Sequence, residues 1–232
     1  MLPRMRGITT SMLGLAAALA GFGAEEAAAD APKPGRLERA FFGGESAASA
    51  DLTRVAFWSD LLARETPSGD AAKADEGWES DARTLLRDVN AEINAAPYVA
   101  DADNWNQPDH WQTARELSER GGDCEDYATA KYFALRAAGA PASALRVAIV
   151  ADELTRQRHA VLLVRMGDGV VVLDNLRDEV LPASALGYYR PLLALNEENW
   201  LLADPALRRA PPVAPEPVQF AAAAPSSAPT SG

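Results

Sequence analysis

Cysteine and histidine are scarce in this sequence of 232 residues, which contains one cysteine, Cys124, and two histidines. A single cysteine excludes a disulfide within the chain. Two histidines leave little choice of an imidazole base for a catalytic site. With 48% of its residues hydrophobic, the chain is long enough for one good-sized core, so a single domain is expected.

Basic residues are also few, since 22 lysines and arginines stand against 33 acidic residues and give a formal net charge of −11. They form no visible basic patch along the sequence. Nucleic acid and anionic membrane surfaces attract proteins through such patches, so both are disfavoured as partners. The excess of acidic residues mainly favours solubility.

Long apolar runs are absent except near the N-terminus, at residues 8–22. Two arginines precede this run and two glutamates follow it, which predicts a secretory signal peptide over residues 1–29 with cleavage near residue 20 or 29. A retained anchor is the alternative, although the run is short for crossing a bilayer. In an oxidising compartment, a lone cysteine is a candidate reactive thiol.

The first half of the sequence carries helical periodicity. Apolar spacing predicts helices over residues 51–65 and 80–95, and a third, short helix that opens at Pro108. Gly121 and Gly122 end that helix. A central helix then begins near Cys124 and stops before Gly139.

The second half changes to the two-residue period of strands. Runs at 145–150, 159–165 and 170–173, with a turn signal at 166–169, predict antiparallel strands, and 188–195 and 200–202 complete the sheet. Residues 203–232 are dominated by Ala, Pro and Ser and predict a disordered tail. The pattern indicates an α+β domain over residues 37–202, with N-terminal helices and a central helix packed on an antiparallel sheet.

Cys124 lies in the first turn of the central helix. Free backbone N–H groups and the helix dipole favour a thiolate there, and the thiolate is the reactive form of cysteine. The alternative is that Cys124 is a small buried apolar residue.

His159 and Asp174 are the other two candidate catalytic residues. His159 begins one predicted strand and Asp174 ends the next, so antiparallel pairing brings them together. With Cys124 they would form a nucleophile, a base and a group that orients the base. Taken singly, each could also be an ordinary strand residue.

Three carboxylates surround the cysteine, because Asp123, Glu125 and Asp126 are its neighbours. Like charge disfavours the thiolate. A hard divalent cation on these oxygens would remove the conflict, and oxygen ligands suit calcium. The alternative is that acidic residues simply favour the first turn of a helix.

Several blocks of the sequence form a recognisable set, namely Gly122–Ala128, Lys131–Tyr132, His159–Leu162 and Leu173–Asn175, together with Asn90, Tyr98, Asp101 and Asp109–Trp111. With these blocks the sequence resembles the bacterial transglutaminase-like cysteine proteinase family between about residues 82 and 202. Ala114 and Ala160 depart from the family, which tends to have proline and methionine at these positions.

The resemblance implies a papain-like, transglutaminase-like fold, a Cys124, His159, Asp174 triad and a calcium site on Asp123 and Glu125. It also implies a periplasmic protease that cuts the N-terminal region of a large surface adhesin at a paired-alanine site. A membrane-bound cyclic-di-GMP receptor would sequester it and so control biofilm attachment. Two alternatives are transglutaminase-type acyl transfer by the same triad and an inert calcium-dependent binding module.

Overall fold

A single seven-stranded antiparallel sheet forms the centre of the computed structural model, which describes residues 46–65, 82–167 and 169–203. The strand order is β1-β7-β6-β2-β3-β4-β5. The strands are β1 (Ser46–Ser49), β2 (Leu145–Asp152), β3 (Gln157–Met166), β4 (Gly169–Asp174), β5 (Arg177–Pro182), β6 (Tyr189–Leu195) and β7 (Trp200–Ala203). The predicted signal peptide and C-terminal tail lie outside the described residues, apart from Ala203, which ends β7.

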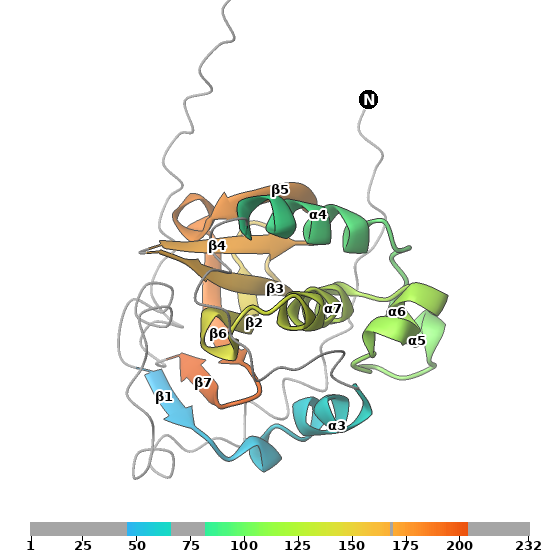
Figure 1. The fold of residues 1–232 in the computed structure, drawn as a ribbon. Coiled ribbons are helices and arrows are strands. Elements are labelled where there is room, and N and C mark those ends of the chain that lie inside the picture. The colour runs from blue at the N-terminus through green and yellow to red at the C-terminus, as the bar shows by residue number, and fades with distance from the viewer. Residues whose placement is uncertain (1–45, 66–81, 168, 204–232) are drawn as a thin grey trace, which may run out of the picture.

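The helices lie mainly on one side of this sheet (Figure 1), and α7 packs against β3 while α4 packs against β5 and α7. They are α3 (Ala56–Arg64), α4 (Ala82–Asn94), α5 (Asp101–Asn104), α6 (Ala114–Arg120) and α7 (Cys124–Ala137). Short 3₁₀ turns occur at η1 (Leu52–Arg54), η3 (Ala142–Ala144) and η4 (Ala183–Leu186). Within the described residues, none of the helices has both the length and the apolar character needed to span a bilayer.

The predicted α+β class and antiparallel sheet are confirmed, and α4 and α7 match their predicted helices closely. The helix predicted from residue 51 begins only at Ala56, after the η1 turn. The prediction that a helix opens at Pro108 is wrong, because α6 begins at Ala114. Thr113 caps it in a reciprocal capping box with Glu116, which fixes the start of the helix at that residue.

The main core lies between α7 and the sheet. Tyr132 and Leu135 of α7 are fully buried against Leu162 of β3 and Leu173 of β4. Truncating a leucine at such a position to alanine typically costs about 2–5 kcal/mol. This packing fixes where the N-terminal end of α7 lies relative to the ends of β3 and β4.

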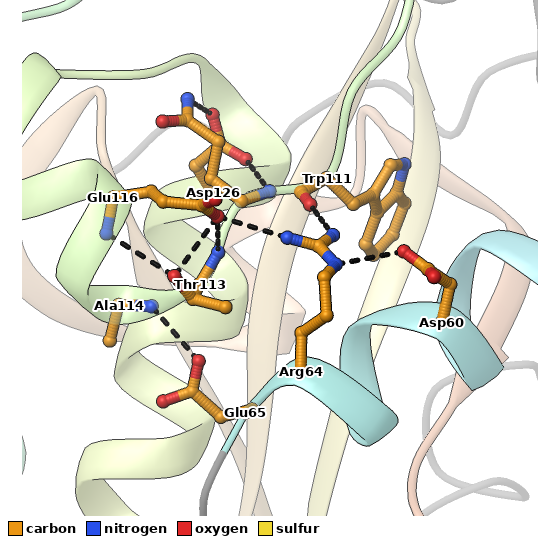
Figure 2. A network of polar contacts seen from close by, with 9 residues as sticks. Asp60, Arg64, Glu65, Trp111, Thr113, Ala114, Glu116 and Asp126 are labelled. Atoms are coloured by element: carbon orange, nitrogen blue, oxygen red, sulfur yellow. Dashed lines mark hydrogen bonds and ion pairs between the residues drawn. The ribbon is translucent and has the colours of Figure 1, made fainter.

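A polar network joins α3 to the segment that leads into α6 (Figure 2). Arg64 of α3 donates hydrogen bonds to the Trp111 carbonyl and to Glu116, at 3.0 Å for the latter, and pairs with Asp60 at 2.8 Å. Glu65 accepts a hydrogen bond from the backbone N–H of Ala114 at 3.1 Å. The network holds the chain that runs toward Cys124 against α3.

Candidate active site

A tight backbone turn places Cys124 at the first position of α7. Gly121 has a φ of 75°, a conformation that favours glycine. A Cβ on Gly122 would lie 2.3 Å from Oδ2 of Asp126 and 2.6 Å from Nε2 of Gln112, so a side chain does not fit there. The two glycines therefore allow the approach to the cysteine that the sequence predicted.

Asp126 fixes this turn from inside. Its Oδ1 accepts a hydrogen bond from the backbone N–H of Gln112 at 2.8 Å, and its Oδ2 accepts from the Gln112 side chain and, at 2.9 Å, from the N–H of Asp123. Both carboxylate oxygens are thus occupied by backbone and side-chain donors. Asp126 is a structural residue of the turn.

A second segment runs alongside the turn. Tyr98 and Gly122 form a parallel β-bridge, in which Val99 donates from its N–H to the Gly122 carbonyl at 2.9 Å and Gly122 donates to the Pro97 carbonyl at 3.2 Å. These bonds attach the Pro97–Val99 segment to the residues just before Cys124.

His159 and Asp174 meet at the end of the sheet. The distance from Nε2 of His159 to Oδ1 of Asp174 is 2.8 Å, and both side chains are buried. Because Nε2 faces the carboxylate, Nδ1 is the ring nitrogen that remains for another partner. His159 also interacts with Cys124. The structure therefore brings His159 and Asp174 together, and it places Cys124 at the start of α7, the helix that packs against β3.

Three further groups bind Asp174. Its Oδ2 accepts a hydrogen bond from the Tyr189 hydroxyl at 2.8 Å and pairs with Nε of Arg177 at 3.1 Å, while its Oδ1 accepts from the N–H of Leu176 at 3.0 Å. The Tyr189 ring also packs against His159, with centroids 5.6 Å apart. Sequence reasoning did not identify Tyr189 or Arg177.

The electrostatics of this pair favour opposite charges. Burial lowers the pKa of His159, but its hydrogen bonds to Asp174 and Cys124 outweigh that effect and raise the pKa to about 9. Burial raises the pKa of Asp174, but the hydrogen bond from His159 and the neighbouring donors lower it to about 2. At neutral pH the two residues form an imidazolium and a carboxylate.

A cluster of acidic residues lies beside Cys124. Single oxygens of Asp101, Asp109 and Glu125 lie within 4.8 Å of one another, and so do those of Asp101, Asp123 and Asp126. Burial, followed by neighbouring negative charge, raises the pKa of Glu125 well above its usual range and that of Asp101 to about 7.

The donor set of this cluster fits a calcium ion. Among the described residues, Oδ1 of Asp101, Oδ1 of Asp109 and Oε1 of Glu125 are buried and have no hydrogen-bond partner. Buried carboxylate oxygens without donors are costly unless a cation compensates them. Asp101 and Asp109 were not predicted as ligands, because they precede Cys124 by 23 and 15 positions and only folding brings them near Glu125.

His110, which sequence reasoning did not select as a ligand or base, contributes to the shape of this region. Its ring lies against Trp105, with centroids 4.4 Å apart, and its backbone N–H donates to Oδ2 of Asp101.

Comparison with protein families finds a match to this chain. The family model described as bacterial transglutaminase-like cysteine proteinase BTLCP matches residues 61–200, which is more than half of the chain. The chain belongs to this family. A bacterial transglutaminase-like cysteine proteinase is a protease with a cysteine nucleophile, and Cys124 is the one cysteine in the sequence.

Solved structures with similarity to this proteinase include Legionella pneumophila LapG. The identity is 28%, the match covers 64% of this chain and 87% of that chain, and the TM-score is 0.47. A calcium-bound form of LapG gives the same identity and coverage with a TM-score of 0.48. An EGTA-treated form gives 29% identity, coverage of 65% and 85%, and a TM-score of 0.48. A comparison with curated proteins finds no match.

Proposed function

We propose that this chain is an exported, calcium-dependent cysteine endopeptidase with a Cys124, His159, Asp174 triad. Its substrate in this proposal is the N-terminal region of a large surface adhesin, cut at a paired-alanine site, which would control biofilm attachment. The observation that supports the catalytic part is the buried hydrogen bond between His159 and Asp174, together with the position of Cys124 at the start of α7, which packs against β3.

In this proposal each nitrogen of the imidazole has its own role. Asp174 holds Nε2–H, so in the resting imidazolium Nδ1 carries the proton that the Cys124 thiol has given up. The thiolate attacks the carbonyl carbon of the scissile bond, and the imidazolium returns the proton to the leaving amine. Water then hydrolyses the acyl-enzyme, with His159 as base, and frees the thiolate.

Asp174 stabilises the imidazolium at each stage of the cycle in which His159 is protonated. Its carboxylate is anchored on the far oxygen by Tyr189 and Arg177, so Oδ1 stays directed at His159. The Cys124 sulfur also lies 3.2 Å from Oε2 of Glu125, which links the nucleophile to the acidic cluster.

Asp123 and Glu125 are the proposed calcium ligands, and the positions of Asp101 and Asp109 add two more candidates. When bound, the ion would supply positive charge that offsets these carboxylates. The role of the ligands is to hold the Cys124 turn in one conformation.

Export to the periplasm and sequestration by a membrane-bound cyclic-di-GMP receptor complete the proposal. Export follows from the N-terminal charge and hydropathy pattern, and the receptor follows from the family resemblance alone. Cell fractionation with an antibody to the chain tests the location: recovery from the cytoplasm at full length would contradict export.

The decisive experiment is incubation of the purified protein with an adhesin fragment that contains a paired-alanine site, followed by mass spectrometry. We expect two products whose masses sum to that of the substrate plus one water, no products with Cys124→Ala, and full activity with Arg115→Ala, a surface change on α6. Cleavage that persists in Cys124→Ala would refute the mechanism. A product that has gained an added amine in place of water would indicate acyl transfer.

A further inference from the structure

Three large apolar side chains are exposed in the part of the chain that the structure describes. They are Tyr98 at 45%, Leu154 at 66% and Leu176 at 40% of their full accessible surface. Single exposed leucines are common on proteins, but apolar groups gathered around one site mark an interaction surface. Two of the three lie beside the candidate active site: Tyr98 pairs with Gly122 in the β-bridge, and Leu176 donates from its backbone N–H to Asp174.

Tyr98 borders the nucleophile. Its backbone forms the β-bridge with Gly122, two positions before Cys124. Burial of part of the phenol and the charges of Asp123, Cys124 and Glu125 raise the pKa of Tyr98. Nearly half of the Tyr98 side chain stays open to solvent.

Leu176 borders the other end of the triad. It lies in the turn between Asp174 and Arg177, which are paired across β4 and β5. Its N–H donates to Oδ1 of Asp174, the oxygen that also contacts His159. The bond fixes the turn, and the leucine side chain remains exposed.

The triad thus forms a row from Cys124 through His159 to Asp174, with one exposed apolar side chain at each end. We infer that Tyr98 and Leu176 are specificity residues that bind an extended polypeptide segment by apolar side chains on both sides of its scissile bond. The inference rests on the proposed endopeptidase function and narrows its substrate class. Removal of one apolar contact of this kind changes discrimination by roughly 10-fold or more.

The test measures binding without turnover, in the Cys124→Ala protein with calcium present. Two fluorescent peptides share a central Ala-Ala pair, which is flanked on both sides by two leucines in one and by two serines in the other. Fluorescence anisotropy gives both dissociation constants. We expect the leucine peptide to bind about 10-fold more tightly, and Tyr98→Ser or Leu176→Ser, each added to Cys124→Ala, to remove most of this preference.

Leu154→Ser is the matched control, because Leu154 is more exposed but its N–H binds Asp152, not a residue of the triad. It should keep the preference, as should the conservative changes Tyr98→Phe and Leu176→Met. The inference is wrong if the parent protein shows no preference, including when it binds neither peptide, or if Leu154→Ser lowers the preference as much as Leu176→Ser. Because catalysis is tested separately through Cys124, failure here leaves the proposed protease activity standing.

Discussion

The Tyr189 hydroxyl donates a hydrogen bond to Oδ2 of Asp174 at 2.8 Å, on the carboxylate oxygen opposite the one that His159 contacts. The same tyrosine ring packs against the imidazole. One side chain from β6 therefore touches two residues of the proposed triad, which come from β3 and β4. Its hydroxyl and ring can be tested separately.

Tyr189→Phe should lower kcat by about 10-fold with little change in KM, because the ring is kept while the Asp174 carboxylate loses a donor. A hydrogen bond to a charged group contributes about 1.5–3 kcal/mol, so the variant should also unfold at lower denaturant concentration. Steady-state kinetics and urea unfolding measure the two effects.

Tyr132→Phe is the control for this change, since Tyr132 is buried in the core and its hydroxyl accepts a hydrogen bond from the N–H of Glu197. It should lose stability but keep kcat. An equal fall of kcat in both variants would show that Tyr189 acts on activity only through general stability.

Activity should fall on the alkaline side near pH 9. In the proposed mechanism His159 must be an imidazolium to protonate the leaving amine, and its pKa is raised to about 9 by Asp174 and Cys124 despite its burial. The group that faces it from β6 is Tyr189, and Arg177 faces Asp174 from β5. A profile of kcat/KM against pH measures this alkaline limb, the fall in activity near pH 9.

Asp174→Asn should move this alkaline limb toward the ordinary histidine pKa near 6.5, because the carboxylate that stabilises the imidazolium is gone. The pKa shifts of His159 and Asp174 also stabilise the folded protein, each over its own pH range. The raised pKa of His159 stabilises the fold below pH 6.5 and is lost as pH rises through 9, and the lowered pKa of Asp174 stabilises it above pH 3.8 and is lost as pH falls through 2. An unchanged limb in Asp174→Asn would contradict the assigned pair.

Lys131 lies two helical turns below Cys124 and is fully buried, with no hydrogen-bond partner for Nζ among the described residues. Burial lowers its pKa to about 7, although Asp174 and Asp178 favour its charge. A lysine pKa depressed in the folded state weakens stability below the unfolded pKa of about 10.4, and the loss is complete below pH 7.

Lys131→Met should therefore raise the free energy of unfolding at pH 6 by about 1–4 kcal/mol, with a smaller gain at pH 10. Lys131→Arg keeps a buried charge and should not raise the free energy of unfolding. Urea unfolding at both pH values measures this, and a loss of stability in Lys131→Met would show that the ammonium is a necessary partner of Asp174 or Asp178.

The closeness of His159 and Asp174 could be predicted from the sequence, because the two-residue period and the turn near Gly167 define adjacent antiparallel strands. Tyr189 could not be found in this way. It reaches the pair because β6 lies beside β2, opposite Asp152, and strand order is set by packing of the whole sheet.

The start of α6 was readable from the sequence but was placed too early. Thr113 and Glu116 have the spacing of a capping box, a stronger start signal than Pro108. By contrast, β5 has no buried residue and no apolar alternation, so its prediction would have needed the neighbouring β4 and α4.

Gly122→Ala should slow alkylation of Cys124 and lower stability, because the added Cβ would lie 2.3 Å from the Asp126 carboxylate that fixes the turn. Overpacking of this kind typically costs about 1–3 kcal/mol. Gly169→Ala is the matched control, since the nearest atom to its Cβ would be 3.8 Å away. Iodoacetamide alkylation followed by mass spectrometry compares the two variants, and equal rates would show that the turn adapts to a side chain.

Calcium should raise the melting temperature of the wild-type protein, and EGTA should lower it, because an ion that binds only the folded state stabilises it by about 2.7 kcal/mol at a concentration of 100 Kd. Magnesium should give a smaller shift, since its small octahedral shell suits a flexible set of carboxylates poorly. Differential scanning fluorimetry measures these shifts without any need for activity.

Asp109→Asn tests calcium binding by the acidic cluster in the same assay without changing a residue that contacts Cys124. Asp109 offers Oδ1 without a hydrogen-bond partner, whereas Glu125 contacts the Cys124 sulfur and a change there would alter both functions. The calcium shift should shrink in Asp109→Asn and persist in Asp103→Asn, an exposed neighbour in α5. Equal calcium shifts in wild type and both variants would place the ion elsewhere, and the acidic cluster would then need protonation to be stable, as the raised pKa values of Asp101 and Glu125 indicate.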